Sequence, residues 1–336
     1  MVRLLAGDIG GTSTRLRLVA FEEESYTAPE SGLLYEQQYP SADAEHLNLI
    51  VKQFLQEANS PLPIAACFAI AGPVKNDTAQ VTNLPWELDA RQMEADLGIK
   101  TIRLINDFAG IGYGIPALQP ADLVVLQDRP AVANATIAVL GAGTGLGEAL
   151  LVWQKKRYEV LATEGGHTDY APRTDLEIGL LQFLRSRHRR VSVERVVSGQ
   201  GIFAIYEYLR SIPGASPSPV VEAQILKEDP SAVIAQQALA DGDPLCVQAL
   251  DLFVANYGAE AGNLALKSLP YGGLYLAGGV GTKILPKLQN GLFLEHFLEK
   301  GRMRPILESL PVSLITNTNV GLIGAERYAQ TLIQPD

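Results

Sequence analysis

The sequence predicts an α/β protein with mixed sheets covered by helices. Short apolar runs of strand length alternate with longer segments whose apolar residues recur at helical spacing. Two stretches of the chain also begin alike, each with a strand, a glycine-rich turn and a second strand. The length of 336 residues suggests two domains or one large domain, and a content of 47% hydrophobic and 19% charged residues is enough to bury a core.

The first part of the chain shows a βββαβα order. Its first helix is expected over Asp43–Ala58, because apolar residues from Leu47 to Leu55 share one face. The second should begin after Asp89 as its N-cap and stop at Gly98. Glu22–Glu24 should form a solvated hairpin tip. Strands are predicted over Arg3–Asp8, Arg15–Ala20, Gly32–Tyr39, Ile64–Ala71 and Thr101–Ile105, and the second helix over Asp89–Leu97.

The second part repeats the strand–turn–strand opening around Gly141–Gly147 and then becomes rich in helices. The Pro- and Ser-rich segment Ser211–Pro219 is expected to be an exposed loop. Strands are predicted over Ala135–Gly141, Glu148–Trp153, Tyr158–Thr163, Gly273–Ala277 and Val312–Ile315. Helices are predicted over Leu176–Arg187, Gly201–Ser211, Pro230–Ala240, Pro244–Ser268 and Val320–Leu332.

Charge and cysteine content exclude several classes of protein. With 27 Lys and Arg against 37 Asp and Glu, the net charge is −10, which disfavours nucleic acid as a partner. Cys67 and Cys246, the two cysteines, cannot build a disulfide scaffold or a Cys-rich zinc site, and they suit a reducing cytoplasm. We expect no signal peptide and no membrane span, because no apolar stretch is long enough.

Two glycine turns are candidate phosphate-binding loops. In the first, Gly10 and Gly11 allow backbone N–H groups to approach an anion, Thr12 adds a hydroxyl donor, and Asp8 could hold a hydrated Mg²⁺. An ordinary hairpin is the alternative, and the pattern matches neither a Rossmann nor a P-loop motif.

The second turn, with Gly143, Thr144 and Gly145, has the same character. A flexible turn would explain it alone, but two such hairpins facing each other would clamp the β- and γ-phosphates of a nucleotide. The later turn at Gly278 and Gly279 offers a flat surface, free of side chains, for adenine or ribose.

Two polar clusters are candidate substrate-binding groups. Asn106 and Asp107 stand between a predicted strand and a helix, where a carboxylate can take a proton from an alcohol, although a helix cap is the favoured explanation of this motif taken alone. Glu164 and His167 frame two glycines after a strand, and Glu194 could add an acceptor for sugar hydroxyls. Structural histidine and surface ion-pair roles are the alternatives.

Other polar features are expected to be structural. The four histidines are scattered without cysteine neighbours, which argues against a zinc site. The basic run from Arg185 to Arg190 is expected to be a solvated helix end.

Taken in order and spacing, Gly7–Thr12, Asn106–Phe108, Leu140–Gly147 and Glu164–His167 resemble the bacterial ATP-dependent glucokinases of the hexokinase/actin-like superfamily, over nearly the whole chain. The resemblance implies an actin-like (ribonuclease H-like) two-domain sugar kinase with its active site in the interdomain cleft. The small domain would span 1–112 with the C-terminal helix 318–336, and the large domain 113–317.

The resemblance also implies the reaction and the residue roles. ATP with Mg²⁺ would phosphorylate glucose at its 6-hydroxyl in the cytoplasm, as the first step of glycolysis, in an enzyme that is expected to be a homodimer. Asp107 would be the catalytic base. Asn106, Glu164, His167 and Glu194 would bind glucose, and the glycine turns would bind ATP.

Departures from related proteins refine this expectation. Ser13 stands where many relatives have Asn, which leaves its contact open. No cysteine follows the Gly166–Tyr170 segment until Cys246, which favours the zinc-free glucokinase group, and no N-terminal DNA-binding domain is expected. Three alternatives remain: a kinase for another hexose or amino sugar, a sugar-sensing regulator, and an actin- or chaperone-like ATPase.

Overall fold

A computed structural model describes residues 1–21 and 32–333 as two compact units, so the expected tip at Glu22–Glu24 lies outside the described residues. Unit 1 comprises the described residues of Met1–Gln119 and of the C-terminal stretch that begins at Asn317, and unit 2 comprises Pro120–Thr316. The boundary expected at residue 112 lies inside the helix Asp107–Gly114, whereas unit 1 continues to Gln119. Each unit is described separately below.

Unit 1 is a five-stranded mixed sheet of order β3-β2-β1-β4-β8, flanked by helices and a small three-stranded sheet, β5-β6-β7. Strands β1–β3 are antiparallel to one another, whereas β4 and β8 run parallel to β1. The elements are β1 (Val2–Ile9), β2 (Ser13–Phe21), β3 (Gly32–Pro40), α1 (Leu47–Glu57), β4 (Ala65–Ile70), β5 (Val74–Lys75), β6 (Thr78–Gln80), β7 (Glu87–Asp89), α2 (Ala90–Leu97), β8 (Thr101–Asn106), α3 (Asp107–Gly114) and α13 (Val320–Thr331).

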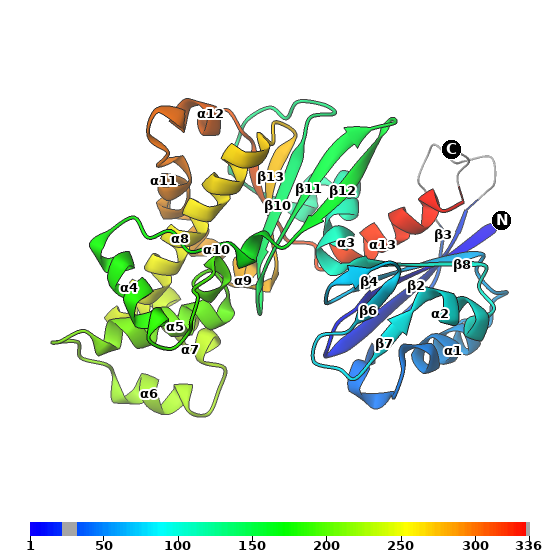
Figure 1. Ribbon diagram of the computed structural model, residues 1–336, viewed down its shortest axis with the longest axis horizontal. Coiled ribbons are helices and arrows are strands. Elements are labelled where there is room, and N and C mark those ends of the chain that lie inside the picture. Colours follow the sequence, from blue (N-terminus) through cyan, green and yellow to red (C-terminus); the bar gives the residue numbers. More distant parts are fainter. Residues whose placement is uncertain (22–31, 334–336) are drawn as a thin grey trace. The chain divides into compact units, whose positions relative to one another are not determined.

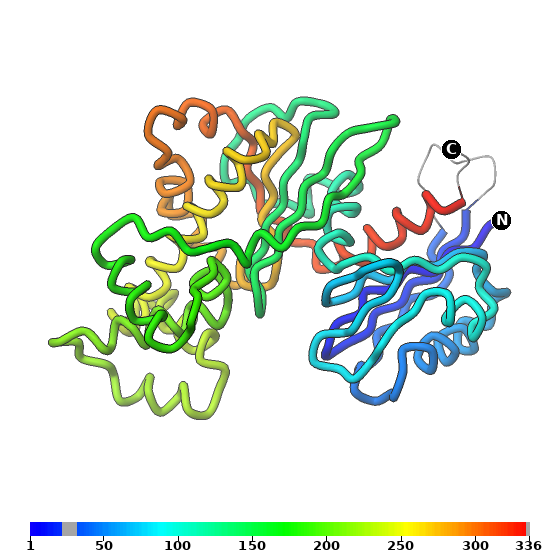
Figure 2. The backbone as a smooth tube through the Cα atoms, viewed as in Figure 1, coloured from blue at the N-terminus to red at the C-terminus, as the bar shows by residue number. Residues whose placement is uncertain are grey.

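Alternation along β1 decides which residues face which helices. Leu5 and Ile9 belong to the buried cluster formed with α1 and α2. Asp8 points to the other face, where α13 packs on β1 and β4. The C-terminal helix therefore lies beside the first strand of the chain, as the red and blue segments of Figure 2 show.

The first helix starts later than its apolar pattern predicts. Asp43 lies in a 3₁₀ turn, Ser41–Asp43, and α1 begins only at Leu47. The reason is tertiary: Ser41 N donates to Thr12 O at 3.0 Å and its hydroxyl donates to Gly10 O at 2.7 Å, which anchors this turn on the β1–β2 hairpin. The caps of α2 are as predicted, with Asp89 accepting from Arg91 N and Gln92 N and with Gly98 in the left-handed region at φ 69°.

Unit 2 repeats the topology of unit 1. Its sheet has the order β12-β11-β10-β13-β14-β9, again with three antiparallel strands followed by two parallel to the first. The edge strand β9, antiparallel to β14, was not predicted from the sequence. The strands are β9 (Leu123–Gln127), β10 (Ile137–Ala142), β11 (Leu146–Gln154), β12 (Arg157–Thr163), β13 (Gly273–Ala277) and β14 (Val312–Ile315).

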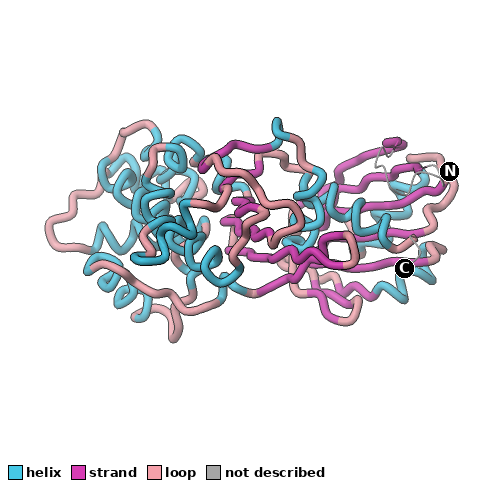
Figure 3. The backbone as a smooth tube through the Cα atoms, turned by 90° about the horizontal axis from the view of Figure 1, so that it is seen from above, coloured by secondary structure: helices cyan, strands magenta, loops and turns pink. Residues whose placement is uncertain are grey.

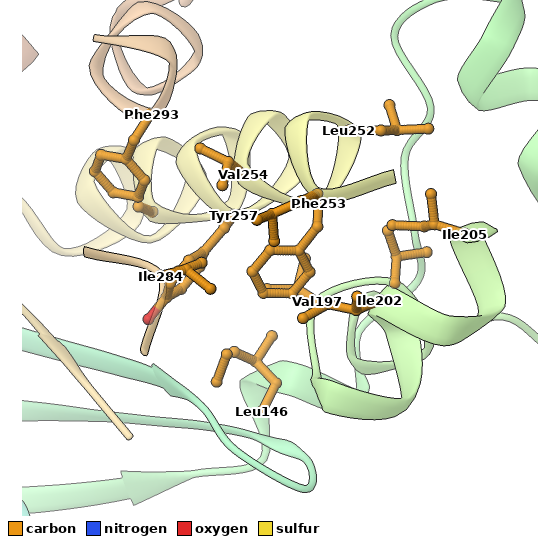
Figure 4. Close-up of a cluster of buried hydrophobic side chains, with 14 of the residues drawn as sticks. Leu146, Val197, Ile202, Ile205, Leu252, Phe253, Val254, Tyr257, Ile284 and Phe293 are labelled. Carbon is orange, nitrogen blue, oxygen red and sulfur yellow. The ribbon is translucent and has the colours of Figure 1, made fainter. Parts of the chain in front are cut away.

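Helices of unit 2 gather beside its strands (Figure 3). The longest of the described helices, α8, is buried throughout residues 252–262, and Figure 4 shows Phe253 and Tyr257 projecting from it toward Leu146. Helix α6, also absent from the sequence prediction, ends the Pro- and Ser-rich loop. The helices are α4 (Asp175–Arg185), α5 (Gly199–Ser211), α6 (Pro219–Ile225), α7 (Pro230–Leu239), α8 (Pro244–Ser268), α9 (Gly279–Lys283), α10 (Leu285–Gln289), α11 (Leu292–Leu298) and α12 (Arg304–Glu308).

Candidate functional site

In unit 1, the candidate residues gather where β1 and β8 end. Asp8 is the penultimate residue of β1, and Asp107 opens α3 directly after β8. The parallel strands β1, β4 and β8 bring these ends to one edge of the sheet. The two carboxylates are within electrostatic range of each other. Together they make this edge of the sheet negatively charged, which would attract a phosphate-bound Mg²⁺.

Asp107 has the properties of a base. Burial raises its pKa to about 6; a hydrogen bond from Phe108 N to its Oδ1 at 2.9 Å works in the opposite direction, and the nearby Asp8 carboxylate adds to the rise. At neutral pH the group is therefore ionised, yet it binds a proton more readily than an ordinary aspartate.

Asn106, rather than Asp107, is the helix cap. Its Oδ1 accepts from Phe108 N at 2.9 Å and from Ala109 N at 3.4 Å, and its Nδ2 donates to Gly72 O at 3.1 Å. The cap interpretation of this motif is thus correct for Asn106, and it leaves the Asp107 carboxylate available for chemistry.

The first glycine turn connects β1 to β2. Gly10 N donates to Ser13 O at 2.9 Å, while Thr12 is exposed at the tip. A Cβ on Gly11 would come within 2.7 Å of Thr82 O, so that position has no room for a side chain. Ser41, which the sequence analysis did not single out, braces this turn from below through its hydroxyl.

Arg15 is a second residue of unit 1 that sequence reasoning missed. It pairs with Asp8 in the β1–β2 register, and its guanidinium donates to Asn319 just before α13. Burial raises the pKa of Asp8, and Arg15 partly offsets that rise. The sequence could have indicated this contact only if the pairing register of β1 and β2 had been predicted.

In unit 2, the second glycine turn, Gly143–Gly145, joins β10 to β11. Gly143 N donates to Gly145 O at 2.8 Å, and Gly143 O accepts from Gly199 N at 2.8 Å. Thr144 is exposed at the tip. A Cβ would meet nothing within 4 Å at Gly143, but at Gly145 it would lie 2.4 Å from Glu194 Oε2.

Glu164, His167 and Glu194 lie together. The Nε2 of His167 is 3.9 Å from Glu164 Oε2, and its Nδ1 is 3.8 Å from Glu194 Oε1. The Glu164 and His167 side chains are 72% and 56% exposed, so both are accessible to a ligand, whereas Glu194 is 26% exposed. Two carboxylates around one imidazole can accept and donate several hydrogen bonds to a polyhydroxylated ligand.

Glu194 joins this cluster to the glycine turn. Its Oε2 accepts from Leu146 N at 2.9 Å, at the first residue of β11. Gly166 packs against the same residue, since a Cβ there would lie 2.1 Å from Leu146 O. The 3₁₀ turns Gly165–His167 and Val193–Arg195 therefore both rest on the start of β11.

A cavity of about 770 Å³ opens beside the second glycine turn. Gly143, Thr144 and Gly279 line it, whereas Gly278 supports it from behind with φ 86° and no room for a Cβ beside Ala142 O. Four basic side chains reach the cavity: Arg187, His188, Arg195 and Lys283.

The basic run is thus more than a solvated helix end. Helix α4 ends at Arg185, and Arg187 and His188 beyond it line the cavity. Arg187 is held there by Glu207 at 2.5 Å and by its position 4.2 Å over the Phe183 ring.

Within the described residues, no group of three or more His, Cys, Asp or Glu side chains is placed to hold a metal ion. The same residues include no helix both long and apolar enough to cross a membrane.

Comparisons with known proteins agree on one family. The family model described as glucokinase matches residues 5–332. The glucokinase of Nostoc punctiforme is 51% identical over 99% of this chain and 100% of its own length. The glucokinase of Synechocystis sp. is 46% identical over 96% of this chain and 97% of its own. A crystal structure of glucokinase from an Antarctic psychrotroph, 33% identical, superposes with a TM-score of 0.85 and covers 98% of this chain and 99% of that one.

Proposed function

Because the chain belongs to the glucokinase family, we propose that it transfers the terminal phosphoryl group of ATP to the 6-hydroxyl of glucose, giving glucose 6-phosphate and ADP. Its fold is that of an actin-like two-domain sugar kinase. One observation supports the assignment most directly: the Glu164–His167–Glu194 cluster is built onto the same hairpin that carries Gly143–Gly145. The proposed sugar-binding residues and the proposed phosphate-binding turn are therefore held by the same β10–β11 hairpin.

Asp107 is the proposed general base. The 6-hydroxyl oxygen forms its bond to the terminal phosphorus, the bridging bond to ADP breaks with its electron pair, and the hydroxyl proton passes to the Asp107 carboxylate. Burial of this carboxylate and a pKa of about 6 support the role, because such a group is ionised at pH 7 and still accepts a proton. The hydrogen bond from Phe108 N fixes one of its oxygens.

Glu164, His167 and Glu194 are the proposed glucose ligands, with Asn106 as a fourth. The exposure of Glu164 and His167 supports this role, since neither side chain is buried in the core and both are accessible to a ligand. Charged acceptors make stronger hydrogen bonds to hydroxyls than neutral ones, so the carboxylates should contribute most.

MgATP is the proposed phosphoryl donor. The turn Gly143–Gly145 and the turn Gly10–Thr12 present backbone N–H groups and the Thr144 and Thr12 hydroxyls to phosphate oxygens. The cavity beside Gly279 has the size of a nucleotide site, and its basic side chains complement phosphate charge. Mg²⁺ would be bound by the phosphates, and the Asp8 carboxylate would accept hydrogen bonds from its water ligands.

The decisive experiment is ADP release by the purified full chain, with and without glucose. Turnover that depends on glucose supports the proposal, whereas equal turnover without sugar would identify an ATPase of the same fold. Turnover only with another hexose or an amino sugar would move the assignment to a different sugar kinase. Absence of turnover with any sugar, in a protein that still binds glucose, would identify a sugar-sensing regulator.

A cytoplasmic location and a homodimer complete the proposal. Both cysteines, Cys67 and Cys246, are free and buried, which suits a reducing compartment. Light scattering on the purified chain measures the oligomeric state, and a mass of one chain would exclude the dimer.

A further inference from the structure

A buried carboxyl group lies directly beneath the proposed sugar-binding turn. Glu148 on β11 pairs with Thr163 on β12, and Thr163 Oγ1 donates to Glu148 O at 2.9 Å. Gly165 N in turn donates to Thr163 Oγ1 at 3.2 Å. A Cβ on Gly165 would lie 2.0 Å from Glu148 Oε2, so the Glu148 carboxyl group fills the space under this glycine. Any movement of Glu148 is therefore transmitted to the turn that carries Glu164.

Glu148 has a second buried carboxyl group within electrostatic range. Glu148 is 4% exposed and Glu260, on α8, is 5% exposed. Among the described residues, Oε1 of each has no hydrogen-bond partner. A buried ionised oxygen without a hydrogen-bond donor is costly, and the negative charge of Glu260 adds to the cost of ionising Glu148. Protonation of Glu148 removes both costs.

Few charged groups face Glu148. Glu260 and Tyr257 approach it from α8, and Lys267 approaches it from the end of the same helix. Burial raises the pKa of Glu148 to about 7, Glu260 adds to the rise, and Lys267 offsets part of it. Burial also raises the pKa of the Tyr257 hydroxyl, so Tyr257 stays neutral. From β12 and the turn, Thr163 and Gly165 contribute no charge.

Glu260 faces a separate polar group on its other side. Its Oε2 accepts from Asn263 Nδ2 at 2.9 Å. Lys300 lies within electrostatic range, but its Nζ donates to Asn263 Oδ1 at 2.7 Å and to Ala259 O at 3.0 Å rather than to Glu260. Glu260 lines a cavity of about 210 Å³. Arg173 and Glu299 line the same cavity and form an ion pair with each other at 3.4 Å. Neither unpartnered oxygen is thus hydrogen-bonded to a cation.

We propose that Glu148 is a positioning residue for glucose binding, which in its protonated state supports the Gly165 turn that presents Glu164 and His167. The inference rests on the proposed role of Glu164 and His167 in sugar binding. Glu148 does not touch the sugar. Loss of the proton from Glu148 leaves a buried carboxylate near Glu260, and Glu148 moves against Gly165, displacing the turn.

The test is the pH dependence of KM for glucose, measured with kcat at saturating ATP from pH 6 to 9. In the natural protein, KM should rise by up to about tenfold per pH unit above the pKa of Glu148, about 7, while kcat changes little. Glu148→Gln mimics the protonated group, so its KM should stay nearly constant over this range. Glu177→Gln, which neutralises another buried glutamate of unit 2, is the matched control and should retain the rise.

Two further variants test the proposal even if Glu148→Gln fails to fold. Glu260→Gln should shift the rise in KM to lower pH, because the negative neighbour that raises the pKa of Glu148 is gone. Gly165→Ala should raise KM at all pH values by displacing the Glu148 carboxyl group. A rise that persists unchanged in Glu148→Gln would overturn the proposal and point to His167 or another group, and a rise unshifted in Glu260→Gln would likewise contradict it.

Glu164→Ala separates this inference from the proposed function. If Glu164→Ala leaves KM for glucose unchanged, the assignment of the sugar site fails. If Glu164→Ala raises KM at every pH while Glu148→Gln keeps the natural pH profile, the sugar site stands and only the role of Glu148 is lost.

Discussion

Glu194 accepts a hydrogen bond from Leu146 N at 2.9 Å, and this contact ties a proposed sugar ligand to the start of the strand that follows the phosphate-binding turn. The same carboxylate lies 3.8 Å from His167 through its other oxygen. One side chain therefore connects the turn at Gly143–Gly145 with the sugar cluster. Substitutions in the turn should affect glucose or ATP according to whether they disturb Glu194.

Gly145→Ala should weaken glucose binding without unfolding the protein. The new Cβ would lie 2.4 Å from Glu194 Oε2, the far end of a side chain that can swing away. A displaced carboxylate loses its sugar hydrogen bond, so KM for glucose should rise about tenfold, the equivalent of one charge-assisted bond. Gly143→Ala is the matched control, because its Cβ meets nothing within 4 Å. Glucose affinity measured by calorimetry without ATP should be unchanged in Gly143→Ala, and equal losses in the two variants would refute the link.

Asp107→Asn should abolish most of the turnover. The amide keeps the size of the side chain but cannot take the hydroxyl proton, so kcat should fall by about 10²–10⁴-fold. Glucose affinity and the melting temperature should change little, since the helix cap is Asn106 rather than Asp107. A variant with near-normal kcat would show that Asp107 is not the base.

The pH profile of kcat/KM should show an acid limb near pH 6. Burial raises the pKa of Asp107 to about 6, and a base must be ionised to act, so kcat/KM should rise with pH up to that value. It should fall again above about pH 7, where the proposed loss of the Glu148 proton raises KM. The contribution of Asp107 to the free energy of unfolding has the opposite pH dependence. Because the pKa of Asp107 is higher in the folded than in the unfolded state, this group stabilises the fold at pH values below its unfolded-state pKa, and the stabilisation is lost as the pH rises through about 6. Glu148→Gln should retain the acid limb, because that residue acts on KM at higher pH. A flat profile from pH 5 to 7 would contradict the assignment.

Asn106 substitutions should separate capping from sugar binding. Asn106→Ala removes the acceptor for Phe108 N and Ala109 N, and it should lower the free energy of unfolding by about 1 kcal/mol. Asn106→Ser preserves a good cap, so denaturant unfolding should find it close to the natural protein. If Asn106 also binds glucose, KM should rise in both variants. A rise confined to Asn106→Ala would assign Asn106 to capping alone.

Local chemistry was sufficient for much of the fold and for the family. Strand alternation, helical periodicity and glycine turns depend on near neighbours in the chain, so β1, β2, α2 with its Asp89 cap, and α8 could be predicted from their residues. The order of the glycine turns, Asn106-Asp107 and Glu164–His167 was specific enough to indicate a glucokinase, which the comparisons confirm.

Only the tertiary structure shows which distant residues meet. Asp43 lies outside α1 because Ser41 is anchored on the Gly10 turn, a contact across 31 residues that no helical pattern contains. Arg187 and His188 were assigned to a solvated helix end, yet folding of α4 beside α5 brings them to the cavity. Glu148 carried no motif, because its position matters only through Gly165 and through Glu260, more than a hundred residues away along the chain. Burial and pairing between segments set the protonation of a carboxyl group, and both are properties of the folded chain rather than of the local sequence.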